Sequence, residues 1–132
     1  VVPCMLITKH FSRLMDKKAL SAIIHVTAKV GSITDNRLGG WYSYRMSKAM
    51  MHMFIKTASI ELKRLNKNLV IAAIHPGTTD SKLSKPFQKH VPAEKLFSPD
   101  KSVGLMIENQ LSKLTEEKSG TLLNWDGSTL PW

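Results

Sequence analysis

A tyrosine and a lysine lie four residues apart in the stretch GGWYSYRMSK, residues 39–48. On a helix, Tyr44 and Lys48 would share one face with adjacent side chains. A phenol, with a pKa of about 10, carries protons poorly at neutral pH, but a neighbouring ammonium favours the phenolate and lowers that pKa. The spacing therefore predicts an acid–base pair that could protonate a carbonyl oxygen or deprotonate an alcohol. The same spacing also occurs by chance, and Lys48 would then only extend along the helix surface.

A long helix must carry this pair. Apolar residues recur at steps of three and four between about residues 43 and 66, which predicts an amphipathic helix. Helical spacing also marks the first 20 residues. Ser98 at an N-cap position and Pro99 at the first helical position predict the start of a further helix.

Short apolar runs between these helices predict buried strands. They are SAIIHVT at 21–27, LVIAAIH at 69–75 and GTLLNW at 120–125. Because helices and strands alternate, we expect an α/β fold with a parallel sheet joined by right-handed crossovers. Such sheets bind ligands at the carboxyl ends of their strands. The stretch 78–97 predicts an irregular, mobile flap in which Phe87 and Phe97 could offer apolar contacts.

The composition is that of a globular protein rather than a disordered one. The chain has 132 residues, of which 42% are hydrophobic and 22% charged, and this length suffices for one domain with a core. The net charge of +9 raises the question of a nucleic-acid partner. The lysines are scattered and are not interleaved with exposed aromatic residues, so we expect a solvated basic surface and no nucleic-acid partner.

The sequence carries no signal for a membrane, a secretory leader or a metal. Its longest aliphatic run, LVIAAI, is far shorter than the ~20 residues of a spanning helix, and no signal-peptide pattern is visible. Cys4 cannot form an internal disulfide, and the histidines lack zinc-ligand spacing. We therefore expect a soluble cytoplasmic protein with no membrane partner and no metal.

Several motifs together resemble a known family. IIHVTAKVGSITDNRLGGWYSYRMSKA, VIAAIHPGTTDSKL and the closing LLNWDGSTLPW are similar to the carboxyl-terminal half of the short-chain dehydrogenase/reductases, most closely their C-factor-like branch. The likeness spans nearly the whole chain, so residues 1–132 would form the carboxyl-terminal portion of a single domain. It implies a partial doubly wound, Rossmann-like parallel sheet of about three strands with flanking helices, lacking the amino-terminal half of the fold.

The resemblance implies a role for each residue of these motifs. Tyr44 matches the family's proton donor and acceptor, and Lys48 matches the lysine that lowers the pKa of that tyrosine and hydrogen-bonds the nicotinamide ribose. A backbone segment lies along the nicotinamide, and the residues after it often contact the cofactor phosphates; the matching positions are Pro76, Gly77 and Thr78, and then Thr79 to Ser81. The cofactor would be NADP or NAD, and the substrate a small carbonyl compound or alcohol.

Three neighbouring residues receive no catalytic role. Tyr42 and Arg45 fit the branch pattern but are interpreted as packing or surface residues. His75 directly precedes the Pro-Gly turn, and we expect a strand-end histidine whose hydrogen bonds are satisfied.

Two departures from the family pattern leave the activity open. Ala28 stands where family members place a substrate-orienting serine; Ser32, twelve residues before Tyr44, could substitute. The seven glycines include no glycine-rich cofactor motif. The chain is thus either part of an NAD(P)-dependent carbonyl reductase or alcohol dehydrogenase, or a non-catalytic binding or signalling module of C-factor type that pairs with another chain.

The helix at 43–66 is apolar on more than one side. Besides the stripe through Met51 and Phe54 it carries Met46, Met50 and Met53. In the resembling family such helices pair between subunits, so we expect a homo-oligomer, although a methionine-rich stripe can also be core. The strand at 21–27 would lie at an open edge of the sheet, which invites pairing with another chain.

Overall fold

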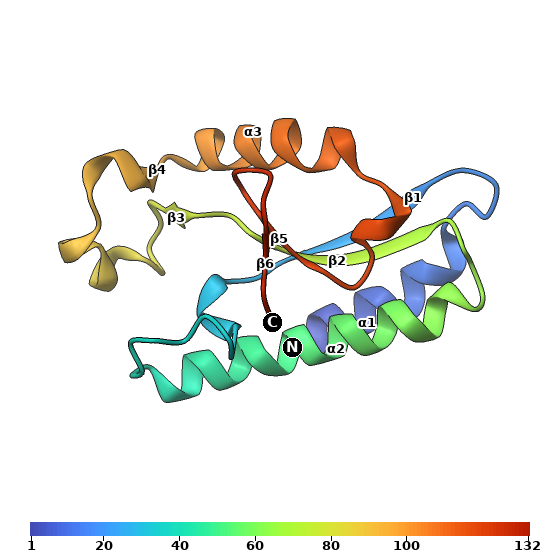
Figure 1. Cartoon of the computed structure of the whole chain (residues 1–132), viewed down its shortest axis with the longest axis horizontal. Helices are drawn as coiled ribbons and strands as arrows, with labels where there is room; N and C mark the ends of the chain where they lie inside the picture. The colour runs from blue at the N-terminus through green and yellow to red at the C-terminus, as the bar shows by residue number, and fades with distance from the viewer.

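The computed structural model describes residues 1–132 apart from the side chain of His90. Figure 1 shows three layers, with the sheet lying between one helix on one side and two helices on the other. The helices are α1 (Val2–Phe11), α2 (Tyr42–Lys63) and α3 (Pro99–Asn109). The strands of the main sheet are β1 (Ser21–Val26), β2 (Leu69–His75), β5 (Leu122–Asn124) and β6 (Thr129–Leu130).

The main sheet has the strand order β1-β2-β5-β6. The first three strands are parallel, with Ile23 opposite Ile71 and Ala73 opposite Leu122. The predicted three-stranded parallel arrangement with flanking helices is therefore confirmed. One strand of this sheet was not predicted: β6 runs antiparallel to β5, so the sheet is mixed.

Strand β2 is the centre of the core because it is covered on both faces. Its alternate side chains Leu69, Ile71 and Ala73 pack with residues of α2, including Ile55. The intervening Val70, Ala72 and Ile74 pack with Met106 of α3. An uninterrupted apolar run is what a parallel strand buried on both faces requires, which is why this strand was read correctly from sequence.

A tight turn explains the extra strand. Between β5 and β6, the backbone N–H of Ser128 donates to the Asp126 carboxylate at 2.9 Å, and Gly127 has φ +94°. Asp-Gly is a strong hairpin signal, and the prediction overlooked it because the flanking strands are only three and two residues long.

Two other boundaries differ from the sequence expectation. Helix α1 ends at Phe11 and is followed by a 3-10 turn, Ser12–Leu14, instead of continuing to residue 20. The stretch 78–97 is not wholly irregular, because β3 (Thr78–Thr79) pairs in parallel with β4 (Leu96–Phe97). At α3 the prediction is confirmed: the Ser98 side chain accepts a hydrogen bond from the Lys101 backbone N–H, and Pro99 begins the helix.

Strand β1 lies at the edge of the sheet. The backbone N–H groups of Ser21 and Thr27 donate to the carbonyls of Asn68 and Ile74. By alternation, the N–H groups of the residues at even positions of this strand point away from β2. Val26 at the end of the strand is exposed.

Buried histidines fasten α1 and α2 to β1 and the loop after it. Thr8 of α1 and Nε2 of His25 on β1 are 2.8 Å apart, and Thr27 and Nε2 of His52 on α2 are 3.0 Å apart. Burial lowers the pKa of His25. Burial also lowers the pKa of His52 to about 4, although the backbone hydrogen bond at Gly31 acts to raise it. Both imidazoles are therefore neutral in the folded chain at pH 7.

The two buried histidines predict that the free energy of unfolding falls in acid. Their folded pKa values lie below the unfolded value of 6.5, so their contribution to stability is complete above pH 6.5 and is lost as pH falls toward about 4. At 1.36 kcal/mol per pKa unit, His52 alone would remove up to about 3 kcal/mol from the free energy of unfolding. Urea unfolding between pH 7 and pH 4.5 would show a flatter pH dependence for His52→Gln than for the parent. The exposed His10→Gln is the control, and an equal pH dependence in both variants would contradict the assignment.

Candidate active site

Helix α2 begins with an unusual backbone turn. Gly39, Gly40 and Trp41 all have positive φ, at +64°, +70° and +51°. The Arg45 guanidinium holds this turn, because Nε donates to the carbonyl of Gly40 at 3.0 Å and Nη2 donates to that of Gly39 at 3.1 Å. Its Nη1 also donates to the carbonyl of Val30 at 3.0 Å. Arg45 thus ties the loop after β1 to the first turn of the helix, a structural role that the sequence did not reveal.

Gly31 brings that loop into direct contact with α2. A Cβ on Gly31 would lie 2.6 Å from the Cβ of Lys48 and 2.7 Å from Cε1 of His52. The helix therefore packs on the bare backbone of this glycine, and any side chain would push the two apart. This close contact sets how near Lys48 lies to the loop at the carboxyl end of β1.

The Tyr44 and Lys48 side chains lie on the same face of α2, as their spacing predicts. The Lys48 ammonium sits 5.7 Å from the centre of the Tyr44 ring. Burial raises the pKa of the Tyr44 phenol, although the residue is still 38% exposed. In the chain alone, burial of the phenol therefore outweighs any lowering of this pKa by Lys48, whose ammonium lies over the ring and not beside the hydroxyl.

The turn after β2 is braced by α3. Ser102, buried on α3, donates its hydroxyl to the carbonyl of Pro76 at 2.7 Å and lies 3.1 Å from the Thr79 hydroxyl. Gly77 has φ +78°, and a Cβ there would approach the Phe97 ring to 2.7 Å. Only glycine fits this turn, whose shape depends on a serine some 25 positions away that no local pattern marks.

One cavity of about 520 Å³ collects most of the predicted site residues. Around it lie the following predicted residues: Tyr44, Lys48, Pro76, Gly77, Thr78, Thr79 and Ser81. The cavity lies at the carboxyl ends of β1 and β2, where a parallel α/β sheet binds its ligands. The structure thus brings together seven residues from two distant segments.

The structure does not bring Ser32 to this cavity. Ala28 lines the cavity, whereas Ser32 is only 2% exposed and is absent from the lining. The Ser32 hydroxyl accepts a hydrogen bond from the Asp35 backbone N–H at 3.0 Å. Ser32 is therefore corrected from a candidate catalytic residue to a loop residue that stabilises its own turn.

Two other expectations around the cavity need correction. His75 lines the cavity, but its buried Nδ1 has no hydrogen-bond partner among the described residues, so it is not the satisfied histidine that we expected. Burial lowers the pKa of His75 to about 4. Of the two flap phenylalanines, Phe87 lines the cavity, whereas Phe97 is buried and packs on Trp125 with ring centroids 4.8 Å apart.

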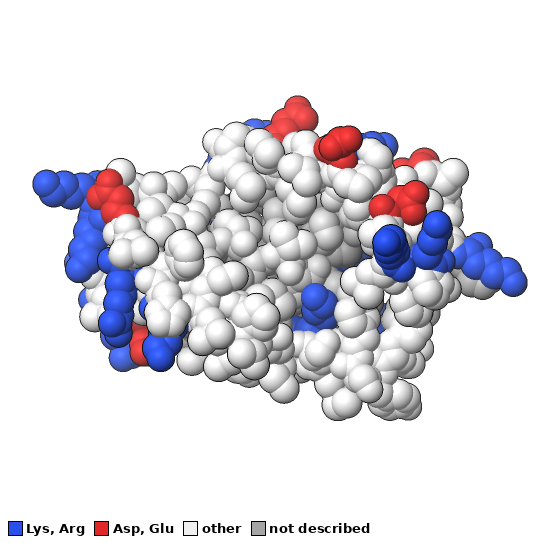
Figure 2. Space-filling model, turned by 180° about the vertical axis from the view of Figure 1, so that it is seen from behind, with Lys and Arg blue, Asp and Glu red and all other residues white. Residues whose placement is uncertain are grey.

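The described residues hold no cluster of three or more His, Cys, Asp or Glu side chains suited to a metal ion. Nor does any helix in the described part of the chain have the length and hydropathy that crossing a membrane requires. Figure 2 shows most of the Lys and Arg side chains of one face gathered toward its two ends, with a broad and mostly uncharged surface between them.

A mostly parallel sheet with flanking helices, and a tyrosine–lysine pair that shares a cavity with a Pro-Gly turn at the strand ends, define a partial Rossmann-like fold. The family model described as short chain dehydrogenase matches residues 1–92. The chain belongs to the short-chain dehydrogenase family, and the resemblance seen in the sequence is confirmed.

Two curated relatives illustrate this membership. The chain is 32% identical over 114 residues to the C-signal protein of Myxococcus xanthus, covering 86% of this chain and 63% of that protein. It is 35% identical over 108 residues to 1-hydroxy-2-glutathionyl-2-methyl-3-butene dehydrogenase of Rhodococcus sp. (strain AD45), covering 81% of this chain and 45% of that enzyme. The chain thus spans about half to three fifths of the length of these relatives.

Two solved structures have a fold similar to that of this chain. NADPH-bound carbonyl reductase from chicken fatty liver superimposes with a TM-score of 0.79 at 31% identity, covering all of this chain and 54% of that one. The carbonyl reductase Sniffer of Drosophila melanogaster gives a TM-score of 0.77 at 26% identity, covering 99% and 53%. The fold of this chain is therefore about half of a short-chain dehydrogenase.

The turn at Gly77 predicts a specific sensitivity. Gly77→Ala should lower the free energy of unfolding by about 2 kcal/mol or more, because the new methyl group adds left-handed strain and a clash with Phe97. Gly104→Ala is the matched control, since Gly104 is helical, faces open space and should gain about 0.5–1 kcal/mol as alanine. Urea unfolding measures both, and equal stabilities would show that the turn tolerates a side chain.

Proposed function

We propose that this chain contributes the proton-transfer pair and the nicotinamide side of the cofactor site to an NAD(P)-dependent carbonyl reductase or alcohol dehydrogenase. The observation that carries the proposal is the single cavity shared by Tyr44, Lys48 and the segment Pro76–Thr79. NADPH is bound by the carbonyl reductase to which the fold is similar, and this supports the same cofactor class here.

The residues of the cavity fit the nicotinamide half of such a cofactor. The cavity volume lies within the range of small-molecule sites. Across the described residues, Lys48 makes no ion pair, so its ammonium is available to donate to ribose hydroxyls. The required glycine at position 77 leaves the turn without a side chain beside the cavity. No glycine-rich turn occurs in the sequence to hold a pyrophosphate, so these residues suit the nicotinamide and its ribose rather than the adenylate half.

When bound, the reduced nicotinamide supplies a hydride to the carbonyl carbon. Tyr44 donates its phenolic proton to the carbonyl oxygen, so that the substrate gains one hydride and one proton and becomes an alcohol. Lys48 stabilises the phenolate that remains until solvent returns a proton. The raised pKa of Tyr44 keeps the phenol protonated before the reaction. Ala28 cannot orient the carbonyl by a hydrogen bond, and lacking such a donor costs on the order of 100-fold in rate.

Tyr44→Phe tests the proposed chemistry. Removing the phenolic proton should lower carbonyl reduction by about 100-fold or more, measured in a protein that carries this chain with the amino-terminal half of the fold. Affinity of the chain for reduced nicotinamide mononucleotide, followed by its fluorescence, should change little, whereas Lys48→Met should weaken it. Tyr42→Phe, at an exposed position one half-turn away, is the control and should behave as the parent.

Two results would count against this function. Reduction at the parental rate by Tyr44→Phe would remove Tyr44 from the mechanism. A flat fluorescence response with reduced nicotinamide mononucleotide would instead favour the second candidate, a non-catalytic binding or signalling module. Two observations favour that candidate: the alanine at position 28 and the similarity to C-signal.

In either function, we propose that α2 pairs with a second copy of the chain. Exposed apolar side chains form one stripe along α2 at helical spacing, namely Met46, Met50, Met53 and Ile60. Leu6 and Phe11 on the adjacent α1 are also about half exposed. An apolar surface spread over two neighbouring helices is typical of a protein–protein interface.

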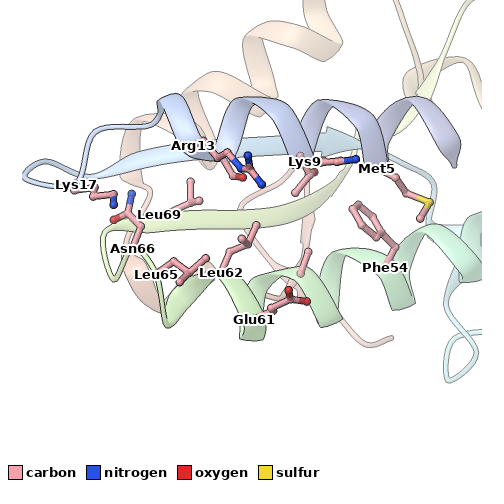
Figure 3. Close-up of a pocket in the computed structure, with 13 residues that line it drawn as sticks. Met5, Lys9, Arg13, Lys17, Phe54, Glu61, Leu62, Leu65, Asn66 and Leu69 are labelled. Atoms are coloured by element: carbon pink, nitrogen blue, oxygen red, sulfur yellow. The ribbon is translucent and has the colours of Figure 1, made fainter.

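A groove between α1 and α2 would take part in this pairing. Its volume is about 400 Å³. Figure 3 shows Phe54, Leu62 and Leu65 reaching into it from the α2 side, while Lys9 extends from α1 and Arg13 from the 3-10 turn after α1. Glu61 lies on the α2 side of the same groove. Opposite charges on its two walls would let two copies related by a two-fold axis pair Glu61 with a basic residue of the other copy.

Met50→Glu should weaken this dimer by about tenfold or more, because a carboxylate would be buried without a partner. Met50 is 61% exposed in the single chain, so the folding stability of the monomer should hardly change. Sedimentation equilibrium over a range of concentrations measures the effect. Leu83→Glu, at an exposed apolar position outside α1 and α2, is the control; a monomeric parent would refute the pairing.

A further inference from the structure

We propose that Trp41 and Phe87 form an aromatic wall at the substrate end of the cavity and select carbonyl compounds with a planar aromatic ring attached to the carbonyl group. This proposal rests on the carbonyl reduction proposed above and deepens it by naming the substrate class. Both residues line the cavity that holds Tyr44, and neither was assigned a role in catalysis or cofactor binding.

The backbone of Trp41 is strained, and a glycine at this position would avoid the strain. With φ +51° and ψ +42°, it is the one non-glycine residue with positive φ within residues 1–89 and 91–132. A side chain is unfavourable in this left-handed conformation, and the two preceding residues, in the same conformation, are glycines. A third glycine would relieve the strain. Such outliers gather at ligand sites, where the surrounding structure holds them.

The indole is held on two sides. The Arg45 guanidinium lies 5.8 Å from the centre of its ring, within cation–π range, and is itself fixed by three backbone carbonyls. The Phe87 ring meets it edge to face at 5.5 Å and 68°. Phe87 belongs to the 3-10 segment Lys85–His90, so the pair joins the start of α2 to the flap that follows β3.

The two rings remain available to a ligand despite this contact. Trp41 and Phe87 are each 51% exposed. Leu83 and Val91 of the flap also line the cavity, and none of its described lining residues is Asp or Glu. An apolar wall with two exposed rings offers edge-to-face and offset stacking to a third ring, an attraction that an aliphatic ring of equal size does not receive.

The position of Trp41 specifies where the ligand ring would lie. Trp41 is the N-cap residue of α2, three positions before Tyr44, and the two side chains line the same cavity. A carbonyl oxygen placed at the Tyr44 hydroxyl would therefore leave its directly attached substituent beside the indole. Aryl ketones and aryl aldehydes have that arrangement.

The test compares two ketones that differ in one ring. Acetophenone and cyclohexyl methyl ketone are titrated into the chain while the indole N–H signals are followed by NMR, with the signals assigned from Trp→Phe variants. We expect acetophenone to bind about three- to tenfold more tightly and to shift the Trp41 signal. Trp41→Gly should bring the affinity ratio to about one without loss of thermal stability, since it relieves the backbone strain.

Further variants separate a binding role from a structural one. Trp41→Phe should keep a preference for acetophenone, and Phe87→Leu should reduce it. Trp132→Phe is the control, because Trp132 packs on His52 outside the cavity lining. Equal affinity for the two ketones, no binding of acetophenone, or a preference that survives in Trp41→Gly would each overturn the proposal.

Failure of the aromatic wall and failure of the proposed reductase would give different results. Preferential binding of acetophenone through Trp41, with no reduction in the protein that carries both halves of the fold, would support the aromatic wall and refute the reductase. Reduction that depends on Tyr44 but shows the same ratio of kcat/KM for the two ketones before and after Trp41→Gly would support the reductase and refute the wall.

Discussion

The packing of α2 on the bare backbone of Gly31 is the constraint on which the cavity depends. With no Cβ between them, Lys48 and His52 lie directly against the loop after β1, and the amino-terminal half of α2 is held beside the strand ends. His52 then reaches Thr27. From the other side of the sheet, Ser102 of α3 fixes the carbonyl of Pro76. Tyr44, Lys48 and the Pro-Gly turn therefore line one cavity because two separate helices are each fastened to the strand ends.

The electrostatics of the cavity follow from burial more than from charge pairs. Burial raises the pKa of Tyr44 although Lys48 is near, and burial lowers the pKa of His75 to about 4 even though Asp126 and Asp35 oppose that effect. The chain alone thus presents a protonated phenol, a neutral imidazole and a cation without an ion-pair partner among the described residues. Under the function proposed above, that set of groups would take ligand hydroxyls near Lys48 and an uncharged carbonyl near Tyr44.

Much of this arrangement could be predicted from sequence because its signals are local. The four-residue spacing of Tyr44 and Lys48, the apolar run of β2 and the Ser98 cap each depend on neighbours along the chain. The residues that were missed depend on distant partners: Arg45 on three loop carbonyls, Ser102 on the turn after β2, and Trp41 on a ring from the flap. Ser32 was misjudged because counting positions could not show that its hydroxyl is used within its own turn.

The free edge of β1 bears on how this chain behaves when a cell makes it alone. Alternate backbone N–H and C=O groups of Ala22, Ile24 and Val26 face away from β2, and each can bond to any extended segment that passes by. At high concentration, newly made copies of the chain would therefore pair with one another through this row of backbone groups. When the chain is expressed alone, we therefore expect aggregation through this outward row, more than the stability of the well-packed centre of the sheet, to limit how much of it stays in the supernatant.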